Sequence, residues 1–341
     1  MAGVRVFFAT NRNFQPGNKL QAFGPRFNPD GVAALRFGYA DFDAGAGSDG
    51  PKLSKVTVYA ERKTATGIQG GSDRFLEDLR RLMSGEKSDT LVFIHGFNVS
   101  FTGALEAGAR LAQDVRVNGE PVNIVVFSWP SDGQAVPLMS YYSDREDARA
   151  SGPALGRTYL KLRDYLEELN AQAYCERRLH LLAHSMGCYV LRQGLQAALV
   201  KEPKALTRVF HEIMLAAPDE DDDAFETDTK LRLLPRLGRQ VTVYFNPDDR
   251  ALLISDKTKS NPDRLGSDGP RLIDLIPKKI VLVDCRHVGG RGDPLARHSY
   301  YVRSPAMAAD IGAVLNGAEP DAIGNREYVT TKRFWRLIQE L

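Results

Sequence analysis

Residues Leu181–Leu191 read LLAHSMGCYVL, and the interpretation of the whole chain depends on the serine inside this stretch. The apolar residues before Ser185 are typical of a buried strand, and the pattern from Met186 onward is typical of a helix. Ala183 and Gly187, two positions on either side of the serine, are both small, as a tight strand-to-helix turn requires. Ser185 is therefore either a nucleophile exposed on such a turn or a small residue that fills it.

Short apolar, β-branched segments recur along the chain, and from residue 90 onward they alternate with helical patterns. Strands are predicted at 4–10, 34–42, 55–61, 90–96, 123–129, 179–185, 210–218, 241–246 and 279–285. Amphipathic helices are predicted at 72–84, 151–170 and 186–200. Several strands are apolar on both faces, which is typical of strands covered by helices on each side. The pattern predicts an α/β fold with a mostly parallel central sheet flanked by helices, and an antiparallel edge formed by the first three strands.

The chain of 341 residues contains no internal repeat and no low-complexity linker, so we expect a single domain over residues 1–341. The mixture of charge, Pro and Gly at roughly 250–278 predicts a short flap. The tail at 329–341 has the pattern of an amphipathic helix, whose aromatic pair is expected to pack on the body of the protein.

The composition gives no argument for a nucleic-acid or membrane partner. Apolar residues make up 43% and charged residues 26%, and the formal net charge is only +2, with no basic stripe. The three cysteines show no metal-type spacing, so we expect reduced thiols, no metal and no cofactor. No apolar run approaches the ~20 residues of a membrane span. The start resembles a first strand more than a signal peptide, which predicts a cytoplasmic location. No pattern specifies an oligomeric state.

A second motif, TLVFIHGFNVSF at 90–101, places a loop directly after a strand. In acyl-transfer enzymes of this topology, such a loop supplies one backbone N–H to the oxyanion hole, and the residue after the nucleophile supplies the other. These donors are predicted to be the N–H groups of Phe97 and Met186. His95 is expected to bond to loop backbone instead of transferring protons, and Asn98 is a candidate for the substrate pocket.

Acyl transfer by a serine also needs a base and a carboxylate that orients it, and both are expected after the serine in the chain. Asp249 is the first choice for the acid because it follows the penultimate strand, with the adjacent Asp248 or the earlier Asp219 as alternatives. For the acidic run 219–223 a solvated loop at a helix N-terminus is the expectation. A catalytic carboxylate or a cation site remains open there.

Two histidines follow the last predicted strand and are candidates for the base. His287 is only two residues beyond Cys285, which leaves it little freedom to reach back over the sheet, so His298 is preferred. The earlier His180 and His211 lie inside predicted strands and are expected to pack in the core.

The motifs FFATNR, VFIHGFNVSF, FSWPSDG, LLAHSMGCYVL, LAAPDED, NPDDRAL and RHSYY occur in this order along the chain, and the resemblance that they carry covers residues 4–315. Together they resemble a family of bacterial α/β-hydrolases of unknown function, often described as esterase/lipase-superfamily enzymes, here with an A-H-S-M-G turn. The resemblance implies an α/β-hydrolase fold with Ser185 as nucleophile, His298 as base and most naturally Asp249 as acid. Many members of that family look exported or lipid-anchored.

The expected function is that of a serine hydrolase that cleaves small-molecule carboxylic esters through an acyl-enzyme. The shortness of the expected flap favours short or medium acyl chains. Trp129, Tyr141 and Tyr142 either line the acyl or alcohol pocket or pack in the core. A lipase, thioesterase or acyltransferase would use the same three side chains, and a non-catalytic binding protein with the same fold is the alternative from another class.

Overall fold

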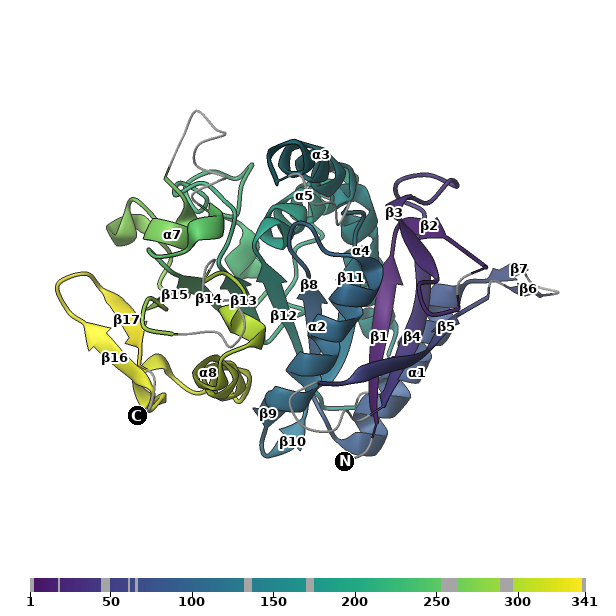
Figure 1. The fold of residues 1–341 in the computed structure, drawn as a ribbon, viewed down its shortest axis with the longest axis horizontal. Coiled ribbons are helices and arrows are strands. Elements are labelled where there is room, and N and C mark those ends of the chain that lie inside the picture. The colour runs from purple at the N-terminus through teal and green to yellow at the C-terminus, as the bar shows by residue number, and fades with distance from the viewer. Residues whose placement is uncertain are drawn as a thin grey trace.

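A computed structural model gives the arrangement of the chain (Figure 1). It describes residues 3–17, 19–43, 50–60, 62–64, 67–131, 137–169, 175–252, 263–288 and 297–338. Within these residues an 11-stranded sheet has the order β16-β17-β15-β14-β13-β12-β8-β11-β1-β4-β5. Its strands are β1 (Val4–Thr10), β4 (Arg36–Asp43), β5 (Lys52–Val58), β8 (Thr90–Ile94), β11 (Asn123–Ser128), β12 (Leu179–His184), β13 (Glu212–Ala216), β14 (Gln240–Phe245), β15 (Ile280–Asp284), β16 (Arg326–Val329) and β17 (Phe334–Leu337).

The centre of the sheet is parallel and both ends are antiparallel, which confirms the predicted fold class. The strands from β1 through β11, β8, β12, β13 and β14 to β15 pair in parallel, and β17 continues this direction beside β15. The strands β4 and β5 form the antiparallel N-terminal edge, as expected from the absence of long helices between the first three strands. Three small two-stranded sheets lie outside: β2 (Arg12–Phe14) with β3 (Phe23–Phe27), β6 (Arg62–Thr64) with β7 (Gly67–Gln69), and β9 (Arg116–Val117) with β10 (Glu120–Pro121).

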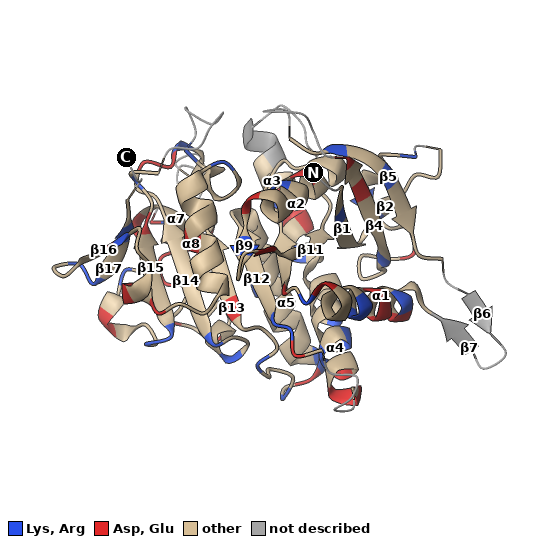
Figure 2. Ribbon diagram, turned by 90° about the horizontal axis from the view of Figure 1, so that it is seen from below, with Lys and Arg blue, Asp and Glu red and all other residues tan. Residues whose placement is uncertain are grey.

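Helices cover both faces of the sheet, so the central strands are buried on each side (Figure 2). The helices α1 (Gly71–Glu86), α4 (Gly152–Glu168) and α5 (Met186–Lys201) pack on one face, and α2 (Phe101–Asp114) and α8 (Pro305–Leu315) on the other. The two apolar clusters between these layers explain why β12 and β13 are buried along their whole length. Two further helices, α3 (Pro137–Ala150) and α7 (Leu265–Asp268), lie toward the carboxyl ends of the parallel strands (Figure 1).

The prediction of a C-terminal helix at 329–341 is wrong, because the described part of this segment belongs to a β-hairpin. The strands β16 and β17 pair antiparallel, and Trp335 of β17 is the register partner of Val283 in β15. The ring of Phe334 packs 5.4 Å from that of Phe245, so the aromatic residue is buried by extending the sheet. Arg326 adds a bidentate contact to the buried Asp310 of α8, at 2.6 and 2.7 Å. Residues 339–341 lie outside the described range.

Of the flap expected at 250–278, residues 253–262 lie outside the described residues. The described part that follows contains α7 and a single turn at Ile273–Leu275. Basic and acidic segments are interspersed over the part of the chain that Figure 2 colours by charge. None of the described helices is both long and apolar enough to cross a membrane.

Candidate active site

Ser185 lies at the sharp turn between β12 and α5, with a backbone conformation of φ 53° and ψ −126°. This conformation is strained for a residue with a side chain, and such strain is typical of functional turns. The turn is held by the Ser185 N–H, which donates to Ala216 O in β13 at 2.9 Å. Close packing explains the small residue at 187, since a Cβ on Gly187 would lie 2.5 Å from His95 O. Ala183 is fully buried in β12.

His298 and Asp249 meet above the carboxyl ends of the parallel strands. His298 Nδ1 lies 2.6 Å from Asp249 Oδ2, and the Asp249 side chain is fully buried. The other oxygen of Asp249 accepts the backbone N–H groups of Ala251 and Leu252 at 3.0 and 3.3 Å. The imidazole of His298 is 4.6 Å from that of His184, the residue that precedes Ser185. The carboxylate, the imidazole and the serine turn are therefore neighbours.

The alternative acids and the alternative base have other surroundings. Asp248 points to solvent with an exposed side chain and pairs with Arg297 at 2.9 Å. Asp219 is buried, accepts the Tyr141 hydroxyl at 2.8 Å and lies 3.4 Å from Arg264. His287 is exposed on the turn after β15. None of these three makes the contact that joins Asp249 to His298.

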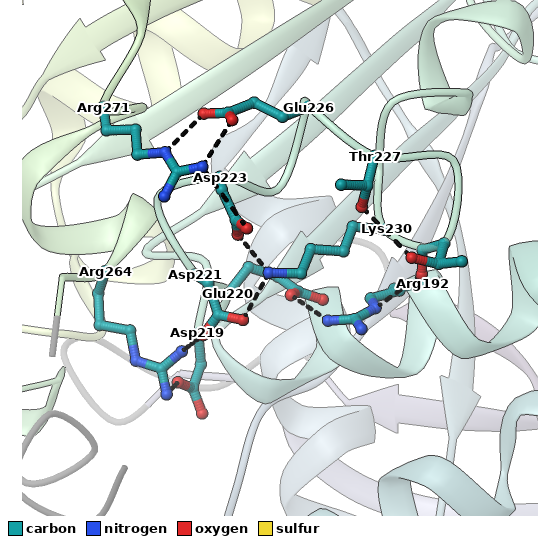
Figure 3. Close-up of polar contacts among 11 residues, drawn as sticks. Arg192, Asp219, Glu220, Asp221, Asp223, Glu226, Thr227, Lys230, Arg264 and Arg271 are labelled. Carbon is teal, nitrogen blue, oxygen red and sulfur yellow. Dashed lines mark hydrogen bonds and ion pairs between the residues drawn. The ribbon is translucent and has the colours of Figure 1, made fainter. Parts of the chain in front are cut away.

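The acidic run at 219–223 differs from the solvated loop that we expected, because Asp219, Glu220 and Asp222 are buried. It forms turns that are not followed by a helix, and basic side chains surround it (Figure 3). The ion pairs are Arg264 with Asp219 and Asp221, Lys230 with Asp221 and Asp223, Arg192 with Glu220, and Arg271 with Glu226. Burial raises the pKa of Glu220 to about 7, against the opposing effect of Arg192. Paired in this way, the carboxylates hold the loop between β13 and β14 in place.

Neither a metal site nor a thiol site emerges from the described residues. They contain no group of three or more His, Cys, Asp or Glu side chains that could hold a metal ion. The cysteines are free thiols, and burial raises the pKa of both Cys188 and Cys285. Cys188 lies at the start of α5 with its Sγ 3.3 Å from Ala183 O, so it packs against the strand that precedes Ser185.

The loop after β8 lies directly against the serine turn. A Cβ on Gly96 would be 2.9 Å from Ser185 Cβ, so only glycine allows this approach. The next residue is Phe97, and Met186 begins α5 on the other side of the serine. The two predicted oxyanion donors therefore belong to segments that flank Ser185, and their role stays a prediction.

His95 and Trp129 form a buried stack beneath this loop, with ring centroids 5.1 Å apart. His95 Nδ1 donates to Gly96 O at 2.8 Å, and Nε2 accepts the Trp129 N–H at 3.2 Å, which fixes a neutral tautomer. Burial and the charge of Arg12 lower the pKa of His95 to about 3. His95 thus bonds to loop backbone as expected. Trp129 is fully buried, so of its two predicted roles the structure gives packing in the core.

The other candidates for the pocket differ in exposure. Tyr141 on α3 is buried, and its ring lies 5.9 Å from that of Phe97. Tyr142 is 53% exposed and packs edge-on against Tyr141. Asn98 is exposed, with φ 57°, and its backbone N–H donates to Asp144 at 3.0 Å. Tyr142 and Asn98 thus offer side-chain surface near the loop, and Tyr141 serves as its support.

Sequence reasoning missed three buried polar residues near the site: Arg12, Asp144 and His184. Arg12 stands in the quoted motif FFATNR and His184 directly precedes the serine, but neither motif assigned the residue a role. His180 is buried in β12 as expected, with Nε2 3.4 Å from Asp89. His211 differs from the expectation, because it precedes β13 instead of lying inside a strand, and its side chain is 26% exposed.

A strained serine turn at the carboxyl edge of a mostly parallel sheet, with helices on both faces, defines an α/β-hydrolase fold. Within this class the chain belongs to the family described as "Alpha/beta hydrolase of unknown function (DUF900)", which it matches over residues 73–316. The family description names no substrate.

Two solved structures are similar at low identity. A lipase-esterase related protein from Clostridium acetobutylicum is 12% identical, with a TM-score of 0.30, over 69% of this chain and 96% of that one. The acylaminoacyl peptidase of Pyrococcus horikoshii is 10% identical, with a TM-score of 0.33, over 81% of this chain and 47% of that one. At these scores neither comparison bears on substrate or mechanism. No curated protein matches the chain significantly.

Proposed function

We propose that this protein is a serine hydrolase that cleaves carboxylic esters through an acyl-enzyme, with Ser185 as nucleophile, His298 as base and Asp249 as the acid that orients the base. The single observation that carries the proposal is the 2.6 Å contact between His298 Nδ1 and the fully buried Asp249 carboxylate, beside the strained turn at Ser185. A carboxylate on Nδ1 leaves Nε2 as the nitrogen that accepts the serine proton.

In this mechanism His298 takes the proton from Ser185 Oγ as the oxygen attacks the acyl carbon. Asp249 stabilises the imidazolium that forms, and its burial makes this interaction stronger than it would be in water. The N–H groups of Phe97 and Met186 bind the oxyanion. The protonated His298 then gives its proton to the leaving alcohol, and water releases the acyl group by the reverse path. No step needs a cofactor.

The substrate class in this proposal is a small-molecule ester with a short or medium acyl chain. Exposed Tyr142 and Asn98 near the loop after β8 supply the candidate contact surface for it. A series of p-nitrophenyl esters of increasing chain length tests this part. We expect kcat/KM to be highest for the short and medium chains, and a maximum for long-chain emulsions would contradict it and favour a lipase.

The reaction type is tested with a fluorophosphonate probe on the purified protein. We expect labelling of the wild type, loss of labelling in Ser185→Ala, and full labelling in the control Ser84→Ala, which changes an exposed serine on α1. A folded wild type that is not labelled would contradict the enzyme and favour a non-catalytic binding protein. Thioesters, and esters offered with an added acyl acceptor, separate a thioesterase or an acyltransferase from an esterase.

A further inference from the structure

The motif FFATNR contributes a buried arginine that the proposed chemistry does not use. Arg12 begins β2, and its residue is 1% exposed. Its guanidinium donates to Val99 O at 2.8 Å, to Ser128 Oγ at 3.0 Å and to Ser131 O at 3.3 Å. A guanidinium has five N–H donors in a rigid fork, so it can hold several carbonyl groups at once in one geometry. Arg12 thereby joins the end of β11 to the loop after β8.

A buried carboxylate reaches the same loop from the other side. Asp144 lies on α3 and is fully buried. Its Oδ2 accepts the Asn98 N–H at 3.0 Å and the hydroxyl of Ser131. Ser131 Oγ in turn accepts the Val99 N–H at 3.2 Å. Asp144 therefore accepts one N–H group of the loop directly and holds the serine that accepts a second, and Arg12 donates to a carbonyl group of the same loop.

These contacts fix the two residues that follow Phe97. The N–H of Asn98, the N–H of Val99 and the carbonyl of Val99 all have a partner in this set. Asn98 has φ 57°, a region that asparagine adopts more readily than most other residues with a side chain. Ser131 contacts both charged residues, so they act on the loop as one unit, and we call Arg12, Ser131 and Asp144 the loop clamp.

We infer that the loop clamp positions the candidate oxyanion donor, so that Arg12 and Asp144 are positioning residues for the transition state. The inference rests on the proposed function, because the loop matters for chemistry only if Phe97 N–H binds an oxyanion. An oxyanion hole works because its donors are already aimed at the charge that develops, and small displacements of a positioned group cost large factors in rate. Loosening the clamp is therefore expected to reduce binding of the transition state more than binding of the substrate.

The first test is Asp144→Asn, which keeps the size of the side chain and removes its charge. We expect kcat to fall about 10- to 100-fold with KM changed less than about twofold, since the loss of a whole oxyanion donor costs about 10²–10³. The inhibition constant of a trifluoromethyl ketone, which binds serine hydrolases as a tetrahedral adduct, is expected to rise by the same factor as kcat/KM falls. Glu146→Gln is the matched control, an exposed carboxylate on the same helix, and should leave all three constants unchanged.

Two further variants test the same inference in case Asp144→Asn does not fold. Ser131→Ala removes only the bridging hydroxyl, and Arg12→Lys keeps the charge but replaces the fork by one ammonium that cannot reach three oxygens. We expect each to lower kcat in the same way, and Ser131→Ala combined with Asp144→Asn to cost less than the product of the two single effects. The exposed Arg5→Lys in β1 is the control for the arginine.

The inference is overturned if these variants lower the thermal midpoint but keep wild-type kcat and inhibitor binding in the folded protein, because the clamp would then serve the fold alone. It is also overturned if KM rises while kcat stays constant. Failure of the proposed function itself looks different: the wild type would not react with the fluorophosphonate probe.

Discussion

His184 Nε2 lies 3.2 Å from the backbone oxygen of His298, so the residue before Ser185 is bonded directly to the loop that carries the candidate base. Burial lowers the pKa of His184 well below its usual value, and the charge of the neighbouring His298 acts in the same direction, whereas the hydrogen bond to the His298 carbonyl opposes them. The ring is therefore neutral, and its Nε2–H can donate to the carbonyl. The same ring stacks on Tyr301 at 4.2 Å, which holds it in this orientation.

We predict that His184→Phe, which keeps an aromatic ring against Tyr301 but removes the donor, weakens both stability and catalysis. The carbonyl of His298 would lose this partner, which costs about 1–3 kcal/mol in the free energy of unfolding. A drop in kcat of several-fold should accompany it, because the loop of the base is released. Urea unfolding and steady-state kinetics measure the two effects, and wild-type values in both would show that the contact has no function.

The choice among the three candidate acids leads to a second prediction. Asp249→Asn is expected to lower kcat by about 10⁴, as in serine proteases where the orienting aspartate is lost. Asp248→Asn should stay within about twofold of the wild type, because its side chain is exposed and paired only with Arg297 in a surface contact. Full activity of Asp249→Asn together with inactivity of a folded Asp219→Asn would move the acid to the earlier strand.

The lowered pKa of His95 leads to a prediction for how the free energy of unfolding depends on pH. Its pKa is about 3 in the folded protein and about 6.5 when unfolded, so below pH 6.5 the unfolded chain binds a proton that the folded chain does not. The contribution of His95 to the free energy of unfolding is therefore complete above pH 6.5 and should fall by about 1.4 kcal/mol per pH unit as the pH decreases toward 3. His184 adds to this slope in the same direction.

The measurement is the free energy of unfolding in urea between pH 7.5 and pH 4.5, at constant ionic strength. A His95→Gln variant should be less stable at pH 7 but should show a shallower slope below pH 6.5. An equal slope in wild type and variant would mean that His95 is protonated in the folded protein.

Two substitutions of glycine by alanine should have opposite effects on the stability of the protein. Gly187→Ala places a Cβ 2.5 Å from His95 O, and the strand and helix cannot separate without moving the serine turn. We expect it to cost about 1–3 kcal/mol in the free energy of unfolding and to abolish probe labelling of Ser185. Gly85→Ala in α1 meets nothing within 4 Å and should stabilise the protein by about 0.5–1 kcal/mol. Thermal unfolding of both variants checks this, and a stable, fully labelled Gly187→Ala would contradict it.

Most of the sheet could be predicted from the sequence because its central strands are apolar on both faces. The run at 179–185, for example, corresponds to β12 at Leu179–His184, and the helix at 186–200 to α5 at Met186–Lys201. Their order along the chain also implied parallel pairing. The end of the chain was different. The segment 329–337 is short, and it becomes a strand because β17 pairs with β15, a tertiary contact that its local sequence pattern does not reveal.

The candidate site was predicted less completely, for a reason that its residues make clear. Asp248 and Asp249 are adjacent, and their opposite orientations follow from contacts with Arg297 and His298, which lie 49 residues further along. In the same way, Arg12 and Asp144 have a role only through residues far away in the chain. Local patterns identify the type of side chain, but which one points inward is decided by the packed structure.

The position of β1 has a consequence for how the protein folds during its synthesis. β1 is synthesised well before β11, yet it lies inside the sheet beside β11, and Arg12 bonds to Ser131 across 119 residues of chain. One side of β1 must therefore remain unpaired until β11 has left the ribosome. The family match begins only at residue 73, so a fragment cut to that segment would keep Ser185 and His298 but lack the arginine beneath the loop at Phe97. Such a fragment is a poor substitute for the whole chain in any assay of the enzyme.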